Sequence, residues 1–369
     1  MSPAQLAQLN WTVLACAGMI SLLFGVLLHR THFCTMGAVS DAVIMGSFDR
    51  LRQWALALAV SILGFGGLTL AGYISPLQSI YATPSVLWLS TLLGGLLFGW
   101  GMVLASGCGA KSLVRAGAGN LKSLLVLLVM GISALITLKG ILAVPRVHIL
   151  ETFAWSPVPG VFVGQWLSQL AGLELSQGFF AAALCVSSML FVWVVRDRTF
   201  LNSHNLVAGV AVGVLVCCMW LVSGVLGHGL EHPDTLDAFF LATSSRKMES
   251  FSLTAPVALG LDALMYFSDG TKRFTIGMVS VLGIFCGSFI SAQLSGQFKL
   301  EAFSSRTDLL RHLAGGILMG VGGVLAMGCS IGQGLSGMST LSIASVLATA
   351  AMLFGAVLAL LSDLREAAR

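Results

Sequence analysis

Nine mostly apolar runs divide the chain, and each is long enough to cross a bilayer as an α-helix. The runs are Trp11–Leu28, Gln53–Gly72, Val86–Leu104, Leu121–Leu138, Phe179–Val195, Asn205–Leu226, Phe274–Leu294, Leu309–Met327 and Thr340–Leu361. Only 9% of the residues are charged, whereas a soluble domain carries about 25%. The sequence therefore predicts an all-α polytopic membrane protein.

One of these runs occurs twice. The segments GGLLFGWGMVLASGC at 94–108 and GGILMGVGGVLAMGC at 315–329 are identical at ten of fifteen positions, with a constant offset of 221. We interpret the two halves as copies of one unit. We expect a first repeat of four spans over 1–140, a connecting segment with one span over 141–204, and a second repeat of four spans over 205–369.

Both copies end on Gly-Cys followed by small residues, GAKSLVRAGAG in the first half and SIGQGLSGMST in the second. Such a glycine-rich break at membrane depth leaves backbone groups unpaired. It is tolerated only where those groups line a cavity or are buried in protein. Paired breaks at corresponding places in two halves indicate the binding site of a transporter.

Lysine and arginine residues predict the orientation of the spans. With the N-terminus outside and nine crossings, six of the nineteen would lie outside: Lys139, Arg146, Arg246, Lys247, Lys272 and Arg273. The others fall on cytoplasmic segments, as the positive-inside rule requires. This count makes the repeat inverted. It also places the N-terminus outside and the C-terminus inside, which means periplasm and cytoplasm if the chain resides in a bacterial inner membrane.

Two further apolar segments, 32–46 and 251–267, are too broken to span. We expect them to form short re-entrant helices at corresponding places, together with helices near 109–118 and 330–338. If 251–267 crossed the membrane instead, the protein would have ten spans. Asp41 and Asp262 lie in these two segments, where they either line a path or take up a proton, or have a capping role on a polar face.

Three of the eight cysteines, Cys34, Cys108 and Cys329, lie at the predicted breaks. The other five fall inside apolar runs, where a cysteine is usually a small core residue: Cys16, Cys185, Cys217, Cys218 and Cys286. The chain has no CxxC pair, no zinc-like spacing and no GxxxxGK[ST] motif. His228 and His232 are four residues apart, but they lie in an expected outer loop without a third ligand. We therefore predict no metal and no cofactor.

The break motifs resemble the YeeE/YedE family of sulfur-compound transporters. The match rests on FGVLLHRTHFCTMGAVSD at 24–41, GWGMVLASGCGAKSLVRAGAGN at 99–120 and HLAGGILMGVGGVLAMGCSIGQGLSG at 312–337. The resemblance implies uptake of thiosulfate, functional cysteines at Cys34, Cys108 and Cys329, and an hourglass of nine spans with four short helices aimed at its centre. Some relatives carry a small sulfur-carrier domain, so a TusA-like partner would here be a separate cytoplasmic protein. Other relatives are associated with selenium compounds.

Thiol groups suit a path for such an anion, because conduction fails when binding is too tight. A thiol is a weak donor with a polarizable sulfur, so it can hold the terminal sulfur of thiosulfate, while backbone N–H groups hold the oxygens. The predicted path comprises Cys34, Cys108, Cys329, Gly107, Gly109, Gly328, Ser330 and Gln333. Lys111, where the family more often has arginine, and Arg115 either attract the anion on the cytoplasmic side or anchor the chain among lipid headgroups.

Other functions remain open at this point. A membrane-embedded sulfurtransferase would form a persulfide on Cys108 or Cys329, which requires an activated thiolate. A selenium-compound transporter could use the same path. We favour a transporter over an enzyme and expect a sulfur anion and the lipid bilayer as partners, with no nucleic acid. A dianion entering a negative-inside cell costs about 4.6 kcal/mol per 100 mV, so a cation must accompany it or the anion must be consumed inside.

Overall fold

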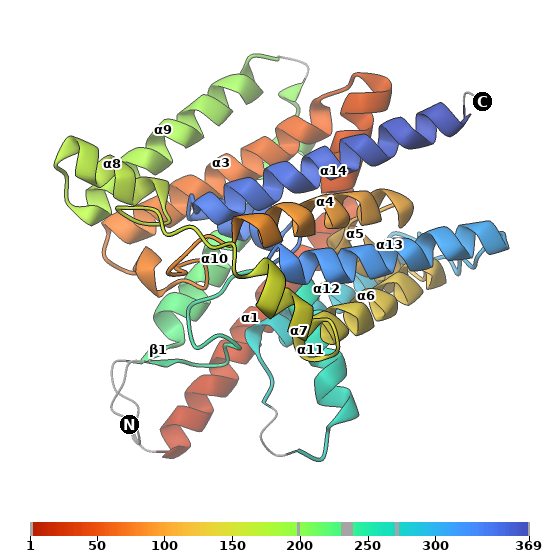
Figure 1. Ribbon diagram of the computed structural model, residues 1–369, viewed down its shortest axis with the longest axis horizontal. Coiled ribbons are helices and arrows are strands. Elements are labelled where there is room, and N and C mark those ends of the chain that lie inside the picture. The colour runs from red at the N-terminus through yellow and green to blue at the C-terminus, as the bar shows by residue number, and fades with distance from the viewer. Residues whose placement is uncertain (1–2, 198–199, 230–238, 270–272, 368–369) are drawn as a thin grey trace.

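The computed structural model describes residues 3–197, 200–229, 239–269 and 273–367 (Figure 1). Within these residues, nine helices are long and apolar enough to cross a membrane. They are α1 (Pro3–Thr31), α3 (Asp49–Leu70), α4 (Trp88–Leu104), α6 (Leu121–Lys139), α9 (Leu175–Val195), α10 (Ser203–Leu221), α12 (Ile276–Leu294), α13 (Arg306–Leu325) and α14 (Ile343–Ala367). The nine predicted apolar runs are thus confirmed as helices. His232 and the basic residues Arg198, Lys272 and Arg369 lie outside the described residues.

Short helices occupy the four segments where they were expected. They are α2 (Thr35–Ser40), which continues as the π-helical turn η1 (Asp41–Met45), α5 (Gly109–Gly117), α11 (Thr254–Met265) and the π-helical turn η6 (Gly332–Gly337). The 12 residues of α11 rise only about 18 Å, well below the roughly 30 Å of a hydrocarbon core. The structure therefore favours nine spans over ten.

The connections contain elements that the sequence did not predict. The long connecting segment carries α7 (Ala143–Pro145), the π-helical turn η3 (Arg146–Leu150) and α8 (Val163–Ala171), which packs on α9. The other elements are the 3₁₀ turn η2 (Pro76–Gln78), the π-helical turn η5 (Val222–Leu226) and the antiparallel strands β1 (His228–Gly229) and β2 (Phe239–Phe240), in which His228 pairs with Phe240.

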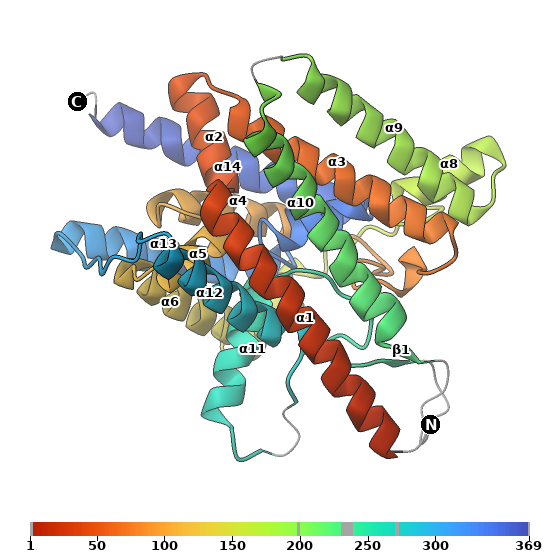
Figure 2. The ribbon, with the colours of Figure 1, turned by 180° about the vertical axis from the view of Figure 1, so that it is seen from behind.

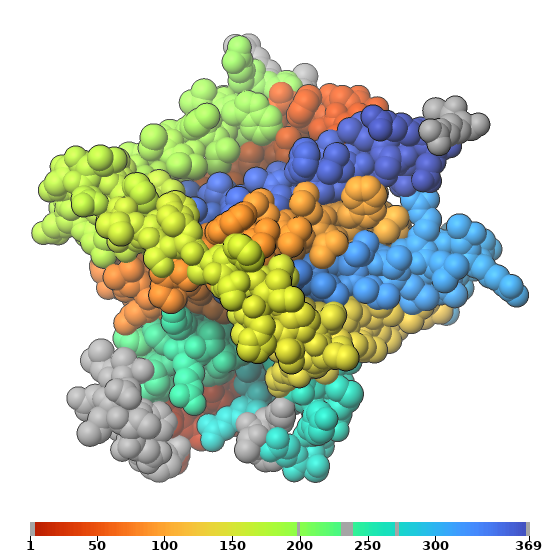
Figure 3. Space-filling model, in the orientation of Figure 1, coloured from red at the N-terminus to blue at the C-terminus, as the bar shows by residue number. Residues whose placement is uncertain are grey.

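The long helices form two rows. Helices α14, α4, α13 and α6 pack side by side in that order and cross one face as adjacent diagonal bands (Figure 3). Helices α12, α1, α10, α3 and α9 form the second row on the opposite side (Figure 2). Each short element contacts one helix of each row: α5 and α11 contact α6 and α12, whereas α2 and η6 contact α14 and α3. The short elements therefore join the two rows.

Helices α4 and α13, which carry the repeated sequence, cross antiparallel and make reciprocal contacts. A Cβ on Gly94 would lie 2.7 Å from the Gly322 carbonyl oxygen, and one on Gly315 would lie 2.7 Å from that of Gly101. The offset of 221 converts each of these contacts into the other. Only glycine permits backbones to approach this closely, so the repeated glycines determine the crossing.

The remaining contacts between long helices also occur in duplicate. Helix α4 packs on α14 as α13 packs on α6, and α1 packs on α12 as α10 packs on α3. The short elements follow the same pattern, since α2 contacts α3 as α11 contacts α12, and α5 contacts α12 as η6 contacts α3. Helix α9 stands apart from these pairs and packs on α3 and α8.

Candidate functional site

The two Gly-Cys breaks have the same backbone geometry. Each helix ends in a Schellman turn whose left-handed residue is Ser106, with φ 55°, or Met327, with φ 56°. The closing hydrogen bonds measure 3.0 and 2.8 Å in both copies: Ser106 N to Val103 O and Gly107 N to Met102 O, and Met327 N to Val324 O and Gly328 N to Gly323 O. A left-handed conformation is uncommon for residues other than glycine, so its repetition indicates that the turn itself is required.

A third break, at Cys34, shares this feature. His32 follows the end of α1 with a φ of 51°. In all three breaks the left-handed residue precedes the cysteine by two positions, since Ser106 precedes Cys108 and Met327 precedes Cys329. The sequence marked the three cysteines, but the common turn became visible only in the structure.

Cys34 and Cys108 are the N-cap residues of α2 and α5, and Cys329 lies in the turn three residues before η6. The Cys34 and Cys329 thiols each accept a hydrogen bond of 3.3 Å, from the N–H groups of Gly37 and Gly332. Cys108 caps α5 through its carbonyl oxygen, which accepts from Ser112 N at 2.9 Å. A sulfur that accepts in this way keeps its own proton free for donation. The backbone therefore fixes the position of the Cys34 and Cys329 thiols without using their donors.

The three thiols lie in one buried region. Cys34, Cys108 and Cys329 are 5%, 1% and 0% exposed and belong to the same core cluster. The Cys34 and Cys108 side chains interact directly, and the Ser330 side chain lies against Cys108. The Cys329 thiol also lies near this pair, close enough to interact electrostatically with Cys108. The other five cysteines are exposed or only partly buried.

The fourth short helix contributes no thiol and brings an aromatic ring instead. Phe251, which precedes α11, stacks on Phe24 of α1 with ring centroids 4.3 Å apart. Its carbonyl oxygen accepts a hydrogen bond of 2.8 Å from Ser336 of η6. The thiol-free segment is thus held against both α1 and the Cys329 break.

Two cations lie beside the Cys108 break. The alkyl chain of Lys111 packs on Gly107, where an added Cβ would lie 3.1 Å from it. The Arg115 guanidinium donates to the Ser106 carbonyl oxygen at 3.5 Å. Among the described residues, neither cation has a carboxylate within 4.0 Å, unlike Lys122, which pairs with Asp308 at 2.7 Å. These two positive charges are therefore not neutralised locally.

The remaining predicted site residues occupy different kinds of position. The side-chain amide of Gln333 forms hydrogen bonds within the protein. Its nitrogen donates to Ala326 O at 2.8 Å and Met327 O at 3.0 Å, and its oxygen accepts from Ser345 at 2.6 Å. Gly109 begins α5, and Gly328 closes the second Schellman turn. The Gln333 side chain therefore supports the turn that presents Cys329.

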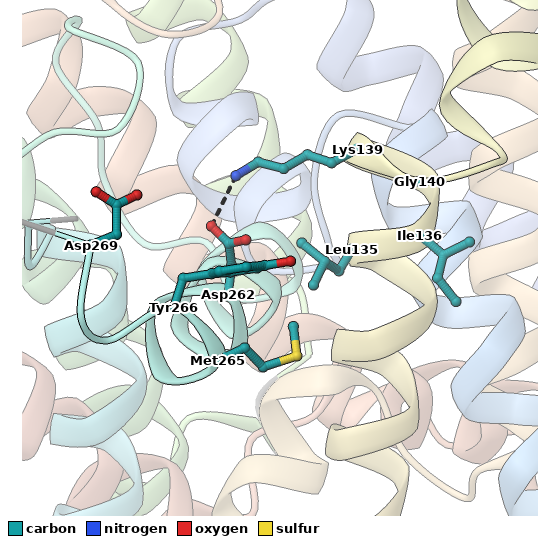
Figure 4. Close-up of a pocket in the computed structure, with 8 residues that line it drawn as sticks. All are labelled: Leu135, Ile136, Lys139, Gly140, Asp262, Met265, Tyr266 and Asp269. Carbon is teal, nitrogen blue, oxygen red and sulfur yellow. Dashed lines mark hydrogen bonds and ion pairs between the residues drawn. The ribbon is translucent and has the colours of Figure 1, made fainter. Parts of the chain in front are cut away.

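The two predicted aspartates are both in ion pairs. Asp41 pairs with Arg50 at 3.3 Å, and Asp262 pairs with Lys139 at 2.9 Å. The second pair lines a cavity of about 480 Å³ between α6 and α11, together with Leu135, Ile136, Gly140, Met265, Tyr266 and Asp269 (Figure 4). Both carboxylates thus have cationic partners, which favours the polar-face role for them.

Sequence reasoning missed Tyr81, which lies in the loop between α3 and α4. Its hydroxyl donates to the carbonyl oxygen of Gly332, three residues after Cys329. Burial raises the pKa of the Tyr81 phenol, and nearby Cys329 adds to the effect, so this donor stays neutral. No periodicity marks a tyrosine in an irregular loop, and only the tertiary contact identifies it.

The long apolar helices, with three buried thiols at the breaks between them, are those of a polytopic membrane protein. The family model described as sulphur transport matches residues 30–358. The chain therefore belongs to the sulphur transport family.

Individual relatives agree with this assignment. The thiosulfate transporter TsuA of Escherichia coli is 29% identical over 330 residues, which cover 85% of this chain and 84% of that protein. The thiosulfate transporter TsuA of Spirochaeta thermophila is 25% identical over 360 residues, covering 94% and 96%. The probable transporter YedE of Escherichia coli is 30% identical over 119 residues, covering 32% and 27%.

Proposed function

We propose that this protein takes up thiosulfate across a bacterial inner membrane, along a path lined by Cys34, Cys108 and Cys329. The observation that carries the proposal is the convergence of three buried thiols, each placed two residues after a left-handed turn residue. Membership of the sulphur transport family and the similarity to two thiosulfate transporters, the TsuA proteins, support the substrate.

We propose that the fold is an inverted repeat. The antiparallel crossing of two helices with equivalent sequence supports this topology, because copies in the same orientation would run parallel. The first repeat covers 1–140, the second covers 205–369, and 141–204 connects them through α9. In this arrangement α2, α5, α11 and η6 are re-entrant, the N-terminus is periplasmic and the C-terminus is cytoplasmic.

In this arrangement the Cys329 break has a different role along the path from the Cys34 and Cys108 breaks. Cys329 belongs to the outer half and meets the anion first, and the adjacent thiols of Cys34 and Cys108 receive it on the inner side. Each thiol donates its S–H to the terminal sulfur, a weak contact that is released easily. Lys111 and Arg115 attract the dianion toward the cytoplasm, because no carboxylate in the described part of the chain neutralises them. Gly107, Gly109, Gly328 and Ser330 provide backbone and side-chain donors next to the thiols.

The contact between Cys34 and Cys108 favours one second candidate, a membrane-embedded sulfurtransferase. In that reaction a Cys108 thiolate attacks the terminal sulfur of thiosulfate, forms a persulfide and releases sulfite. A TusA-like cytoplasmic protein would accept the sulfur. A selenium analogue of the anion would use the same path as thiosulfate.

Serine and alanine replacements separate these possibilities. If the thiols act as donors, Cys108→Ser and Cys329→Ser should keep part of the uptake of radiolabelled thiosulfate in proteoliposomes, whereas the alanine variants should lose roughly tenfold more. Replacement of the exposed Cys286 by alanine is the control and should change nothing. Equal loss in the serine and alanine variants, with a persulfide on Cys108 detected by mass spectrometry, would establish the sulfurtransferase instead. Transport that survives alanine at all three positions would exclude a thiol path.

A further inference from the structure

Three buried hydroxyl groups at the breaks have no hydrogen-bond partner among the described residues. They belong to Thr35, Thr254 and Ser330, which are 5%, 1% and 3% exposed. Thr35 and Thr254 follow the N-cap residues of α2 and α11, Cys34 and Leu253, whereas Ser330 follows Cys329 in the turn that precedes η6. The same position at the fourth break is Gly109, which has no side chain to offer.

Such groups require an explanation, because an unsatisfied buried hydroxyl costs about 1–3 kcal/mol. Two other buried threonines, in long helices, donate to the carbonyl oxygen one turn earlier: Thr69 to Phe65 at 2.9 Å and Thr137 to Ser133 at 2.7 Å. Thr35 and Thr254 are the first residues of α2 and α11, where the preceding backbone is not helical, so that acceptor is missing. The hydroxyls are therefore available to a ligand.

The three hydroxyl groups lie close to the three thiols. Thr35 is the residue after Cys34. Ser330 is the residue after Cys329, and its side chain lies against Cys108. Thr254 follows Leu253, whose backbone N–H lies against the Cys329 thiol. The Thr254 side chain packs against Gly323, near the end of α13, where an added Cβ would lie 2.8 Å from its hydroxyl oxygen. The three hydroxyls thus border the same buried region as the three thiols.

We propose that Thr35, Thr254 and Ser330 bind the sulfonate oxygens of the transported anion. This inference rests on the proposed function and names the groups that select its substrate class. An anion with a terminal sulfur and three oxygens presents two kinds of acceptor. The thiols match the soft sulfur, whereas O–H donors make shorter and stronger bonds to charged oxygens. Anions that carry both kinds of acceptor are therefore preferred.

The test uses the full-length protein in proteoliposomes with radiolabelled thiosulfate. We expect Thr35→Val, Thr254→Val and Ser330→Ala each to raise KM by roughly tenfold, because each removes one donor to a charged acceptor. The midpoint of thermal unfolding should stay constant or rise, since no protein partner is lost. Thr35→Ser and Thr254→Ser keep the hydroxyl and should restore the wild-type KM.

Two controls make the result specific. Thr349→Val removes a hydroxyl that is also buried and unpartnered among the described residues but lies within α14, and Thr69→Val removes one bonded to its own helix. Both should keep the wild-type KM. An unchanged KM in the three break variants, or an equal rise in Thr349→Val, would overturn the inference while leaving the thiol path intact. If the wild type itself transports no thiosulfate, the proposed function fails instead.

Discussion

The Cys108 and Cys329 breaks share a backbone but differ in chemistry. The carbonyl oxygens of their left-handed residues are each capped by a side chain, but by the cation Arg115 at 3.5 Å in one and by the neutral amide of Gln333 at 3.0 Å in the other. The offset of 221 places Gly332 where Lys111 stands and Ser336 where Arg115 stands. The duplicated glycines maintain the geometry, so the side chains are free to diverge. One break has thereby become cationic and the other neutral.

Substitutions at the α4–α13 crossing would disrupt the geometry that the two breaks share, and we expect the largest effect on stability there. A Cβ on Gly101 would lie 2.8 Å from the Gly315 carbonyl oxygen, and one on Gly322 would lie 2.6 Å from that of Gly94. Because both obstacles are backbone, Gly101→Ala and Gly322→Ala should each lower the free energy of unfolding by about 1–3 kcal/mol. Thermal unfolding of the purified protein in detergent measures the change.

Gly67 of α3 supplies the control for this experiment. None of the described residues lies within 4 Å of a Cβ added there, so Gly67→Ala should stabilise the helix by about 0.5–1 kcal/mol. Similar losses at Gly101 and Gly322 would support the reciprocal crossing. A loss at only one of them would show that the two copies do not share the crossing equally.

Because the caps differ, we expect substitutions to reduce stability at the Cys329 break and thiosulfate uptake at the Cys108 break. Gln333→Ala leaves the carbonyl oxygens of Ala326 and Met327 without this donor, and should cost about 1–3 kcal/mol of stability. Arg115→Ala removes a longer bond and an unneutralised charge. It should therefore leave the unfolding midpoint nearly constant and reduce thiosulfate uptake by a few fold at low salt, with a smaller reduction at high salt.

Parallel unfolding and uptake measurements on both variants check this contrast. Arg115→Lys serves as the matched control, because it keeps the positive charge and should retain most of the uptake. If Arg115→Ala destabilised the protein as much as Gln333→Ala, the guanidinium would be a structural cap, and the proposed attraction of the anion would lose its support.

Sequence patterns predicted most of the fold, because a membrane-spanning helix is a long apolar run that composition alone identifies. Nine apolar runs became nine long helices, and the four broken segments became short ones. Helix α8 was missed, since its nine residues are too short to stand out within a connecting segment. The two-residue strands were missed for the same reason.

The candidate site could be predicted only in part. The Gly-Cys motifs identified Cys108 and Cys329, but the contact between Cys34 and Cys108 depends on how α2 and α5 pack between the two rows. Gln333 was expected to line the path, and the sequence did not indicate that its hydrogen bonds also support the turn. The unpartnered hydroxyl of Thr35 could not be anticipated, because satisfaction of a donor is a property of the whole packing.

The smallest expected effect is at Tyr81, whose hydroxyl bonds to the Cys329 break and thus provides a further distinction between the breaks. Its hydroxyl donates to Gly332 O, and its ring packs edge-on against Trp220 with centroids 6.2 Å apart. Tyr81→Phe keeps the ring contact and removes the bond, which should cost about 0.5–1.5 kcal/mol at neutral pH. Burial raises the pKa of the folded phenol above the unfolded value, near 10. The stabilisation is thus fully present below about pH 10 and is lost as the pH rises further. The difference between the two unfolding midpoints should therefore stay constant up to about pH 10 and shrink as the pH rises further, whereas a difference that stays constant above about pH 10 would show that the Tyr81 hydroxyl is not held neutral by its surroundings.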